Sequence, residues 1–427
     1  MVITDEQREI IDSNENIVVN AGAGSGKTST LLEYARKKLQ DNPSAKILYL
    51  VYNKEMKKEA VLKFKGLNVT ISTIHAYAYQ YLCKLGKKPF LGNLIKSEVE
   101  KALAASTSLN NEKYKSVLKY VEYIDSTAND PSPTHPAFPL FDKFKNRQIP
   151  QSHNNYLKEF CKIGVMNYDY ILVDESQDLN INVLHMLENQ NAIKVYVGDT
   201  NQAIYMKLNN TVNVFKLVDH KEFKLTQSFR SSDDCLMEAN AILKHKFNND
   251  SYFLKGMSEG KSTGKFATLS LTNTGVFNHA IVTMGRKLSF YINTDKLESA
   301  IRTITEIDNT FSKNKHHAFY SRFASNSDLR KYAYSVEDFE LADACTLYEK
   351  YKANAVSYLH QLAKENDPTS NYMILTVHGS KGLEFDVVDY KTLFFSRRDI
   401  QRGLNNKDEE IINLTYVAAT RASKINI

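Results

Sequence analysis

A glycine-rich segment near the amino end has the residue types that bind phosphate. It reads Ala21-Gly22-Ala23-Gly24-Ser25-Gly26-Lys27-Thr28-Ser29, between a β-branched run at 17–19 and helically spaced leucines from Leu31. Backbone N–H groups in such a loop turn toward phosphate oxygens, and the following helix adds its positive end. Lys27 suits the β- and γ-phosphates, and the Thr28 hydroxyl suits Mg²⁺. We predict an ATP-binding P-loop over 23–29, although Ala21 replaces the first glycine of the strict pattern.

Two acidic residues, Asp174 and Glu175, follow a second apolar run at 171–173. A P-loop enzyme needs one carboxylate at a strand end to hold Mg²⁺ and another group to orient the attacking water. We assign the first role to Asp174 and the second to Glu175. Taken alone, the pair would more often cap a helix; the P-loop makes the catalytic interpretation the stronger one.

Buried strands must position these residues. The segments 17–19, 171–173 and 192–199 are mostly apolar and lead into polar residues, the third ending in Asp199. Strands buried on both faces of a parallel sheet have this pattern, and ligands bind where their carboxyl ends meet. We predict an α/β protein built on parallel sheets.

The composition restricts the protein class only broadly. At 427 residues the chain has room for two to four domains, and 42% hydrophobic residues can fill their cores. It has no apolar run long enough for a membrane span and no secretory signal pattern, and its four cysteines are scattered. We expect a cytoplasmic protein with free thiols. The net charge of +6 favours a polyanionic partner only weakly.

An ordered series of short motifs is more specific. In chain order these are ITDEQREII (3–11), the P-loop, LYLVYNKEMKKEA (48–60), ISTIHAYAY (71–79), DESQD (174–178), VGDTNQAIY (197–205), LTQSFRSS (225–232), ILTVHGSKGLEFDVV (374–388) and NLTYVAATRAS (413–423). The series resembles the UvrD/Rep type of superfamily 1 DNA helicases. ATLSLTNTGVFNHAI (267–281) and YAYSVEDFELADACTLYEKY (332–351) are most similar to the F-box DNA helicases and their bacterial and phage relatives. We expect no F-box here.

The resemblance implies two RecA-like P-loop motor domains, each carrying a mainly helical insertion. The first motor domain is expected at 1–80 and 152–215, around an insertion at 81–151. The second is expected at 216–284 and 369–427, around a short accessory insertion at 285–368.

The resemblance also implies roles around the nucleotide. Gln7 would read adenine, Phe229 would stack on it in place of the usual tyrosine, and Glu384 would bind the ribose. Gln202 would sense the γ-phosphate. Arg230 and Arg421 would be arginine fingers from the second motor domain, where guanidinium groups suit phosphoryl-transfer charge.

Other motif positions correspond to family contacts with DNA. They are Tyr52, Asn53, Thr73, His75, Tyr205 and His378. Aromatic stacking tolerates any base and suits a translocating motor, although a tyrosine or histidine at a strand end is often only a packed residue. Two departures stand out, since 206–210 reads MKLNN where the family has an Arg-Gly-Ala sequence, and Leu271 replaces an expected arginine.

These features predict an ATP- and Mg²⁺-dependent motor on single-stranded DNA and single-strand/duplex junctions. The resemblance implies a 3′ to 5′ helicase, monomeric and associated with the nucleoid. Two alternatives stay open. One is a translocase that strips proteins from DNA, suggested by the short accessory insertion. The other is the motor subunit of a recombination or anti-phage complex whose nuclease is another chain. An RNA track also stays open, because no residue is identified that reads a 2′-OH.

Overall fold

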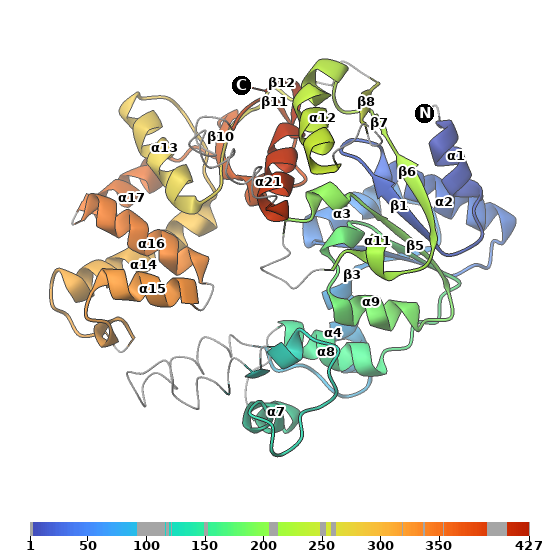
Figure 1. Ribbon diagram of the computed structural model, residues 1–427, viewed down its shortest axis with the longest axis horizontal. Coiled ribbons are helices and arrows are strands. Elements are labelled where there is room, and N and C mark those ends of the chain that lie inside the picture. Colours follow the sequence, from blue (N-terminus) through green and yellow to red (C-terminus); the bar gives the residue numbers. More distant parts are fainter. Residues whose placement is uncertain are drawn as a thin grey trace. The chain divides into compact units, whose positions relative to one another are not determined.

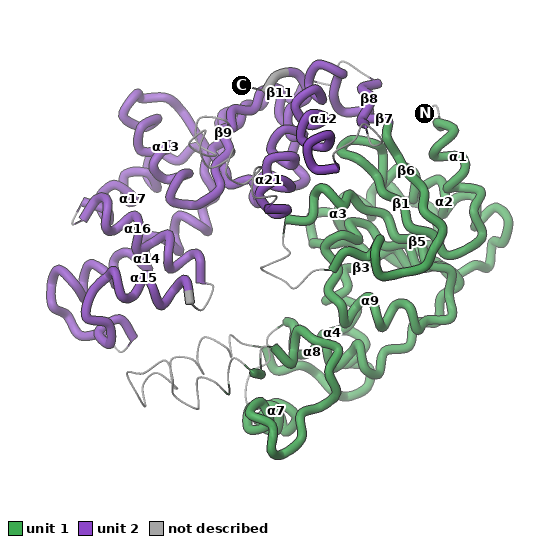
Figure 2. Tube along the Cα trace, in the orientation of Figure 1, with its two compact units in different colours: residues 1–226 green, residues 227–427 purple. Residues whose placement is uncertain are grey.

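Two compact units make up the protein in a computed structural model, one over residues 1–226 and the other over 227–427 (Figure 2). The residues that the structure describes are 3–91, 116, 119–120, 122–148, 153–204, 212–247, 253–257, 262–317, 319–335, 338–352, 354–390 and 408–426. Each unit has its own parallel sheet.

The first unit is built on six parallel strands in the order β3-β2-β4-β5-β1-β6. Their bounds are β1 Ile17–Ala21, β2 Ile47–Val51, β3 Val69–Thr73, β4 Tyr170–Val173, β5 Ile193–Gly198 and β6 Lys221–Leu225. The three predicted strands are β4, β5 and β1, which are neighbours in the sheet. The prediction of an α/β protein with parallel sheets is confirmed.

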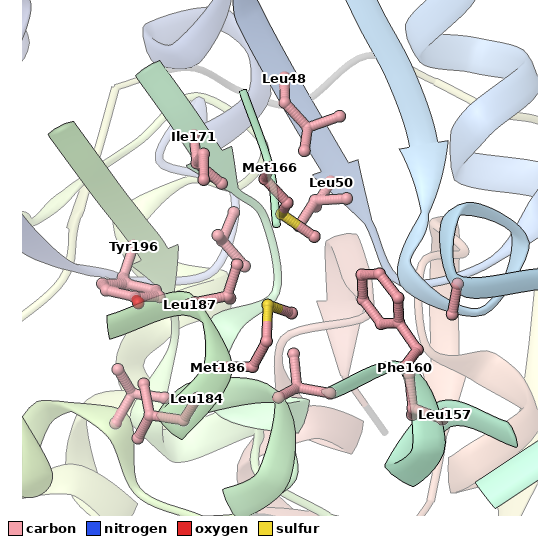
Figure 3. Close-up of a cluster of buried hydrophobic side chains, with 14 of the residues drawn as sticks. Leu48, Leu50, Leu157, Phe160, Met166, Ile171, Leu184, Met186, Leu187 and Tyr196 are labelled. Atoms are coloured by element: carbon pink, nitrogen blue, oxygen red, sulfur yellow. The ribbon is translucent and has the colours of Figure 1, made fainter. Parts of the chain in front are cut away.

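Helices cover both faces of this sheet (Figure 1). They are α1 Asp5–Asp12, α2 Lys27–Asp41, α3 Lys54–Lys63, α4 Ile74–Lys84, α8 His153–Ile163, α9 Ile181–Glu188 and α11 Val214–Leu217, with short 3₁₀ turns η1 Ser176–Asp178 and η2 Thr200–Gln202. Helix α7 Phe138–Lys145 lies apart from the sheet, in a hydrophobic cluster of its own. Successive strand residues point to opposite faces. Val19 therefore packs with Leu31 of α2, whereas its neighbour Val18 belongs to the core beneath α4, α8 and α9. In that second core, Leu48 and Ile171 from the strands face Phe160 and Leu187 from the helices (Figure 3).

Strand β6 belongs to the first unit, although it lies beyond the expected end of the first motor domain. We expected the second motor domain to begin at residue 216, but residues 221–225 form β6 and pair with β1 from Ile17↔Lys221 to Ala21↔Leu225. The sequence KEFKL is mostly polar, as suits an edge strand with its side chains largely in solvent. Such a pattern does not reveal which sheet the strand will join.

The second unit is built on four parallel strands in the order β10-β9-β11-β12. Its strands are β7 Gln227–Ser228, β8 Lys255–Gly256, β9 Phe266–Ser270, β10 Tyr372–Thr376, β11 Phe385–Asp389 and β12 Ala422–Asn426, of which β7 and β8 form a separate pair. Its helices are α12 Asp233–Phe247, α13 Asn273–Gly285, α14 Thr294–Phe311, α15 Asn326–Ser335, α16 Phe339–Tyr351, α17 Asn354–Glu365, α18 Val377–Ser380 and α21 Glu409–Ala419, with the turn η3 Tyr320–Arg322.

A group of helices interrupts the second sheet in sequence but not in space. Strands β9 and β10 pair directly, with Phe266 opposite Tyr372, although α13–α17 lie between them in the chain. Helices α14–α17, orange in Figure 1, pack on one another. None of the helices that the structure describes combines the length and apolar character needed to cross a membrane.

Candidate ATP-hydrolysis site

The loop between β1 and α2 has the backbone that phosphate binding needs. Gly24 and Gly26 have φ of 72° and 80°, a left-handed conformation that glycine adopts without strain. Gly26 is the N-cap of α2. Because glycine has no side chain, it offers no side-chain acceptor to the first N–H groups of this helix. The buried Ser25 hydroxyl has no hydrogen-bond partner among the described residues. A loop with these groups fits the phosphates of a nucleotide.

The sheet brings Lys27 and Thr28 to the two predicted carboxylates. The Lys27 Nζ lies 3.7 Å from Glu175 Oε1, and the Thr28 hydroxyl donates to Asp174 Oδ2 over 3.2 Å. These pairs meet because β1 and β4 run parallel and end at the same edge of the sheet. A hydroxyl beside a carboxylate is the oxygen donor set that Mg²⁺ prefers. The residues present therefore fit Mg-ATP.

Tyr49 adds a contact that sequence reasoning missed. Its hydroxyl donates to Asp174 Oδ2 over 2.6 Å, and Asp174 is only 4% exposed. Burial raises the pKa of Asp174 and the charge of Glu175 raises it further, whereas Lys27 and the bond from Tyr49 oppose the rise. Tyr49 lies inside the predicted motif at 48–60, but its residue type there suggests only a buried aromatic.

Gln177 is a second group that sequence reasoning missed. It donates to Glu175 Oε2 and accepts the backbone N–H of Asp199 at 3.1 Å. The carboxylate of Asp199 in turn accepts from Gln202 Nε2 at 2.8 Å. A series of hydrogen bonds therefore links the predicted phosphate sensor to the predicted base.

Close packing and backbone strain surround that network. A Cβ added at Gly198 would lie 2.3 Å from Gln177 Oε1, so only glycine leaves room for this amide. Glu175 has φ 53°, which is left-handed for a non-glycine residue and costs about 1–3 kcal/mol. Its backbone N–H donates to Asp174 Oδ1 at 2.9 Å. These contacts hold the two carboxylates in a defined relation.

Gln7 lies against the first turns of α2. Its side chain accepts from the Thr4 N–H at 3.1 Å and donates to Thr30 Oγ1 at 3.1 Å. Thr4 and Gln7 form a capping box at the start of α1. The glutamine is thus held beside the P-loop helix by its own amide group.

The remaining predicted nucleotide residues lie in the second unit. Arg230 Nε donates to Glu384 Oε1 at 2.7 Å, and its Nη1 reaches Thr420 O at 3.4 Å. Arg421 is almost fully buried and donates to the carbonyls of Val417 and Leu383. Phe229 is half-buried and precedes Arg230 in the chain. Arg230 therefore contacts both Glu384 and the backbone of Thr420, the residue that precedes Arg421.

The predicted DNA contacts of the first unit lie at the carboxyl ends of β2 and β3. These strands are neighbours, with Val51 opposite Thr73. Asn53 caps α3 by accepting the Met56 N–H, and Thr73 caps α4 by accepting the Ala76 N–H. Each residue thus has a structural role at the same edge of the sheet. Tyr52 lies between Val51 and Asn53, at the end of β2.

His75 lies in an aromatic cluster. Its ring meets those of His153 and Tyr156 edge-on, with centroids 5.9 and 6.3 Å away. Burial, with the charge of His153, lowers the pKa of His75 to about 4. His378 lies in α18 of the second unit. Tyr205 and the departure at 206–210 lie outside the described residues.

Known proteins resemble the chain along most of its length. Residues 7–207 match a family model described as an AAA domain. The chain is 27% identical to F-box DNA helicase 1 of Gallus gallus, over 99% of this chain and 48% of that protein. It is 25% identical to F-box DNA helicase protein 1 of Schizosaccharomyces pombe, over 99% and 57%. It is 20% identical to the ATP-dependent DNA helicase PcrA of Staphylococcus epidermidis, over 87% and 55%.

The chain spans about half the length of the curated relatives it matches. The similarity nevertheless covers both sheets and every motif of the ordered series. The motifs, the two parallel sheets and these relatives together support a superfamily 1 helicase of the UvrD/Rep type.

Proposed function

We propose that the chain is an ATP-dependent motor that moves 3′ to 5′ along single-stranded DNA and separates strands. The observation that carries the proposal is the meeting of Lys27, Thr28, Asp174 and Glu175 at one edge of the first sheet. The names of the relatives, which are DNA helicases, support DNA as the track. The proposed substrates are ATP with Mg²⁺ and single strands next to duplex, acted on by a monomer.

Each residue at the first sheet has a defined task in this proposal. Lys27 neutralises the β- and γ-phosphates, and Thr28 with Asp174 holds Mg²⁺, which supplies charge neutralisation during phosphoryl transfer. Glu175 orients the attacking water and accepts its proton. Gln177 holds the Glu175 carboxylate and ties it to Gln202 through Asp199. Gln7 reads the base.

The second unit supplies cations in the proposed mechanism. Arg230 and Arg421 act as arginine fingers on the γ-phosphate, while Phe229 stacks on adenine and Glu384 binds the ribose. Arg230 pairs with Glu384 in the structure. To act on ATP, this arginine must exchange the carboxylate of Glu384 for a phosphate oxygen. Such an exchange suits a guanidinium, whose forked donors match both groups.

The proposed DNA path begins at the adjoining ends of β2 and β3. Tyr52, Asn53, Thr73 and His75 come from these ends, and we add Tyr205 and His378 from the family motifs. We also propose that 81–151 and 285–368 are insertions into the two motor domains, with the boundary between the domains moved to residue 226 by β6.

A strand-displacement assay tests the motor and its direction. With ATP and Mg²⁺ the protein should release the labelled strand from a 3′-tailed duplex and not from a 5′-tailed one. Glu175→Gln should bind DNA and ATP yet lose turnover about 10²–10⁴-fold, the usual contribution of a general base. Absence of ATPase stimulation by single-stranded DNA would refute the motor, and release from only the 5′-tailed duplex would refute the direction.

A second candidate function is removal of proteins from DNA without useful unwinding. The compact group α14–α17 is the observation that favours it, because a small accessory domain offers little surface for splitting a duplex. Displacement of streptavidin from a biotinylated single strand, compared with release of a 3′-tailed duplex, separates the two functions. Rapid displacement with no duplex release would favour this candidate.

A further inference from the structure

A cavity of the first unit lies between α7, α8 and the segment that carries Tyr120, Tyr123 and Ile124, with a volume of about 410 Å³. It shares no lining residue with the P-loop site. One wall is aromatic and consists of Tyr120, Tyr123, Phe141 and Phe144. These rings belong to a small hydrophobic cluster of their own. The volume lies in the range of pockets that bind small molecules.

The opposite wall is a polar stripe of α8. Asn155, Lys158, Glu159 and Lys162 all line the cavity. Their spacing of three, four and seven residues places them on one helix face. The residues between them, such as Leu157 and Phe160, pack in the main core instead. A helix facing four aromatic rings would ordinarily present apolar residues there.

The cavity has an excess of positive charge. Its lining includes five basic side chains, Lys87, Lys145, Arg147, Lys158 and Lys162, and two acidic ones, Asp130 and Glu159, so the excess is three charges. Lys145 Nζ lies over the Phe141 ring, 5.7 Å from its centroid. Cations beside aromatic rings favour a ligand that is both planar and anionic.

Lys158 is the most deeply placed of these cations. It is 4% exposed, donates to the Ser126 carbonyl, and lies 4.4 Å from the centroid of the Tyr123 ring. Burial lowers its pKa to about 8, and the nearby charge of Lys162 acts in the same direction. The carboxylate of Asp130 bonds to Lys162 and to the Tyr123 hydroxyl. An added anion would therefore stabilise the ammonium of Lys158.

We propose that this cavity binds one nucleotide unit, with its base among the aromatic rings and its phosphate beside Lys158 and Lys145. Nucleotide binding in this cavity is separate from the motor function and requires neither hydrolysis nor movement. The nucleotide could be free or could belong to a single strand. A single strand has a path from the predicted DNA contact His75 to the cavity, because α8 also carries His153 and Tyr156, whose rings contact His75.

Titration of the full-length chain with mant-AMP tests the site, with Lys27→Ala present throughout to weaken binding at the P-loop. We expect saturable fluorescence enhancement. Adding Lys158→Met should weaken it about tenfold or more, the usual effect of losing one charge-assisted contact, whereas Lys158→Arg should keep most of it. If Lys158→Met does not fold, Lys145→Met on the cavity rim replaces it, with an expected loss of several-fold.

Lys38→Met is the matched control, because Lys38 is also buried and lies 4.6 Å from a tyrosine ring, that of Tyr34, but lines no part of this cavity. It should leave mant-AMP binding within about twofold. No saturable binding, or equal loss in Lys38→Met and Lys158→Met, would overturn the proposal. Displacement of bound mant-AMP by a dT oligonucleotide would assign the site to a strand; mant-AMP binding unaffected by the oligonucleotide would assign it to a free nucleotide.

Discussion

Asp174 receives a hydrogen bond at each carboxylate oxygen. Oδ2 accepts the hydroxyls of Tyr49 and Thr28, and Oδ1 accepts the Glu175 N–H. A buried carboxylate needs such donors, because each unmet hydrogen bond to a charged group is expensive. The donors also fix the direction of the oxygens, and so the place where a cation would bind.

Tyr49→Phe removes one of these donors without changing the ring. We expect the free energy of unfolding to fall by about 1–3 kcal/mol, as for loss of a hydrogen bond to a charged group. We also expect a higher Mg²⁺ concentration for half-maximal mant-ATP binding, since Oδ2 is less well oriented. Urea denaturation and a Mg²⁺ titration measure the two effects.

Tyr34→Phe is the control for this change. Tyr34 is also fully buried, but its hydroxyl has no hydrogen-bond partner among the described residues. Its removal should leave stability unchanged or slightly raised, because no bond is lost. Equal effects of the two substitutions would contradict the role given to Tyr49.

At the scale of elements, the end of β5 and the turn η1 approach each other closely. Gly198→Ala would place a Cβ against Gln177 Oε1. We expect about 1–3 kcal/mol of destabilisation from overpacking, together with slower ATP turnover because Gln177 can no longer hold Glu175. Thermal unfolding and steady-state ATPase measurements check both.

Gly285→Ala serves as the comparison. This glycine ends α13, and an added Cβ would meet nothing within 4 Å. Stability should stay unchanged or rise slightly, since alanine favours the helix. Normal turnover in Gly198→Ala would refute the link from Gln177 to Glu175.

The partly buried histidine of α4, His75, predicts that the stability of the fold depends on pH. The pKa of His75 is about 4 in the folded chain and ordinarily 6.5. Between these values the unfolded chain binds more protons, so stability falls as the pH is lowered. From pH 7 to 5 the wild type should lose about 1–2 kcal/mol more than His75→Gln. Urea denaturation at both pH values measures this; exposed His316→Gln should behave as wild type.

At the scale of the whole molecule, the residues proposed to act on the nucleotide are divided between two units. Lys27, Asp174 and Glu175 belong to the first, and Arg230 and Arg421 to the second. Binding and hydrolysis can therefore be separated by substitution. A motor needs this division, because hydrolysis must depend on the relation between its two halves.

Arg230→Ala should lower ATP turnover about 10³-fold or more, the usual effect of losing an arginine finger, while mant-ATP binding changes little. Arg330→Ala is the control, because Arg330 also pairs with a glutamate of the second unit, Glu349. It should keep turnover within about twofold and cost less than about 1 kcal/mol of stability. Equal turnover in the two variants would exclude Arg230 as a finger.

The sequence by itself determined the P-loop, the acidic pair and the parallel α/β architecture. Each of these follows from a local pattern, namely a glycine-rich loop between strand and helix, or apolar runs that end in polar residues. Lys27 and Glu175 meet because parallel strands end at one edge of their sheet.

Only the tertiary structure decided the contacts between distant segments. Tyr49 lies 125 positions from Asp174, and Gln177 reaches the end of another strand. β6 pairs with β1, about 200 positions earlier in the chain, and Lys158 lies against the ring of Tyr123, which belongs to another segment. Residue type alone predicts none of these pairings, because each depends on which distant segments the fold brings into contact.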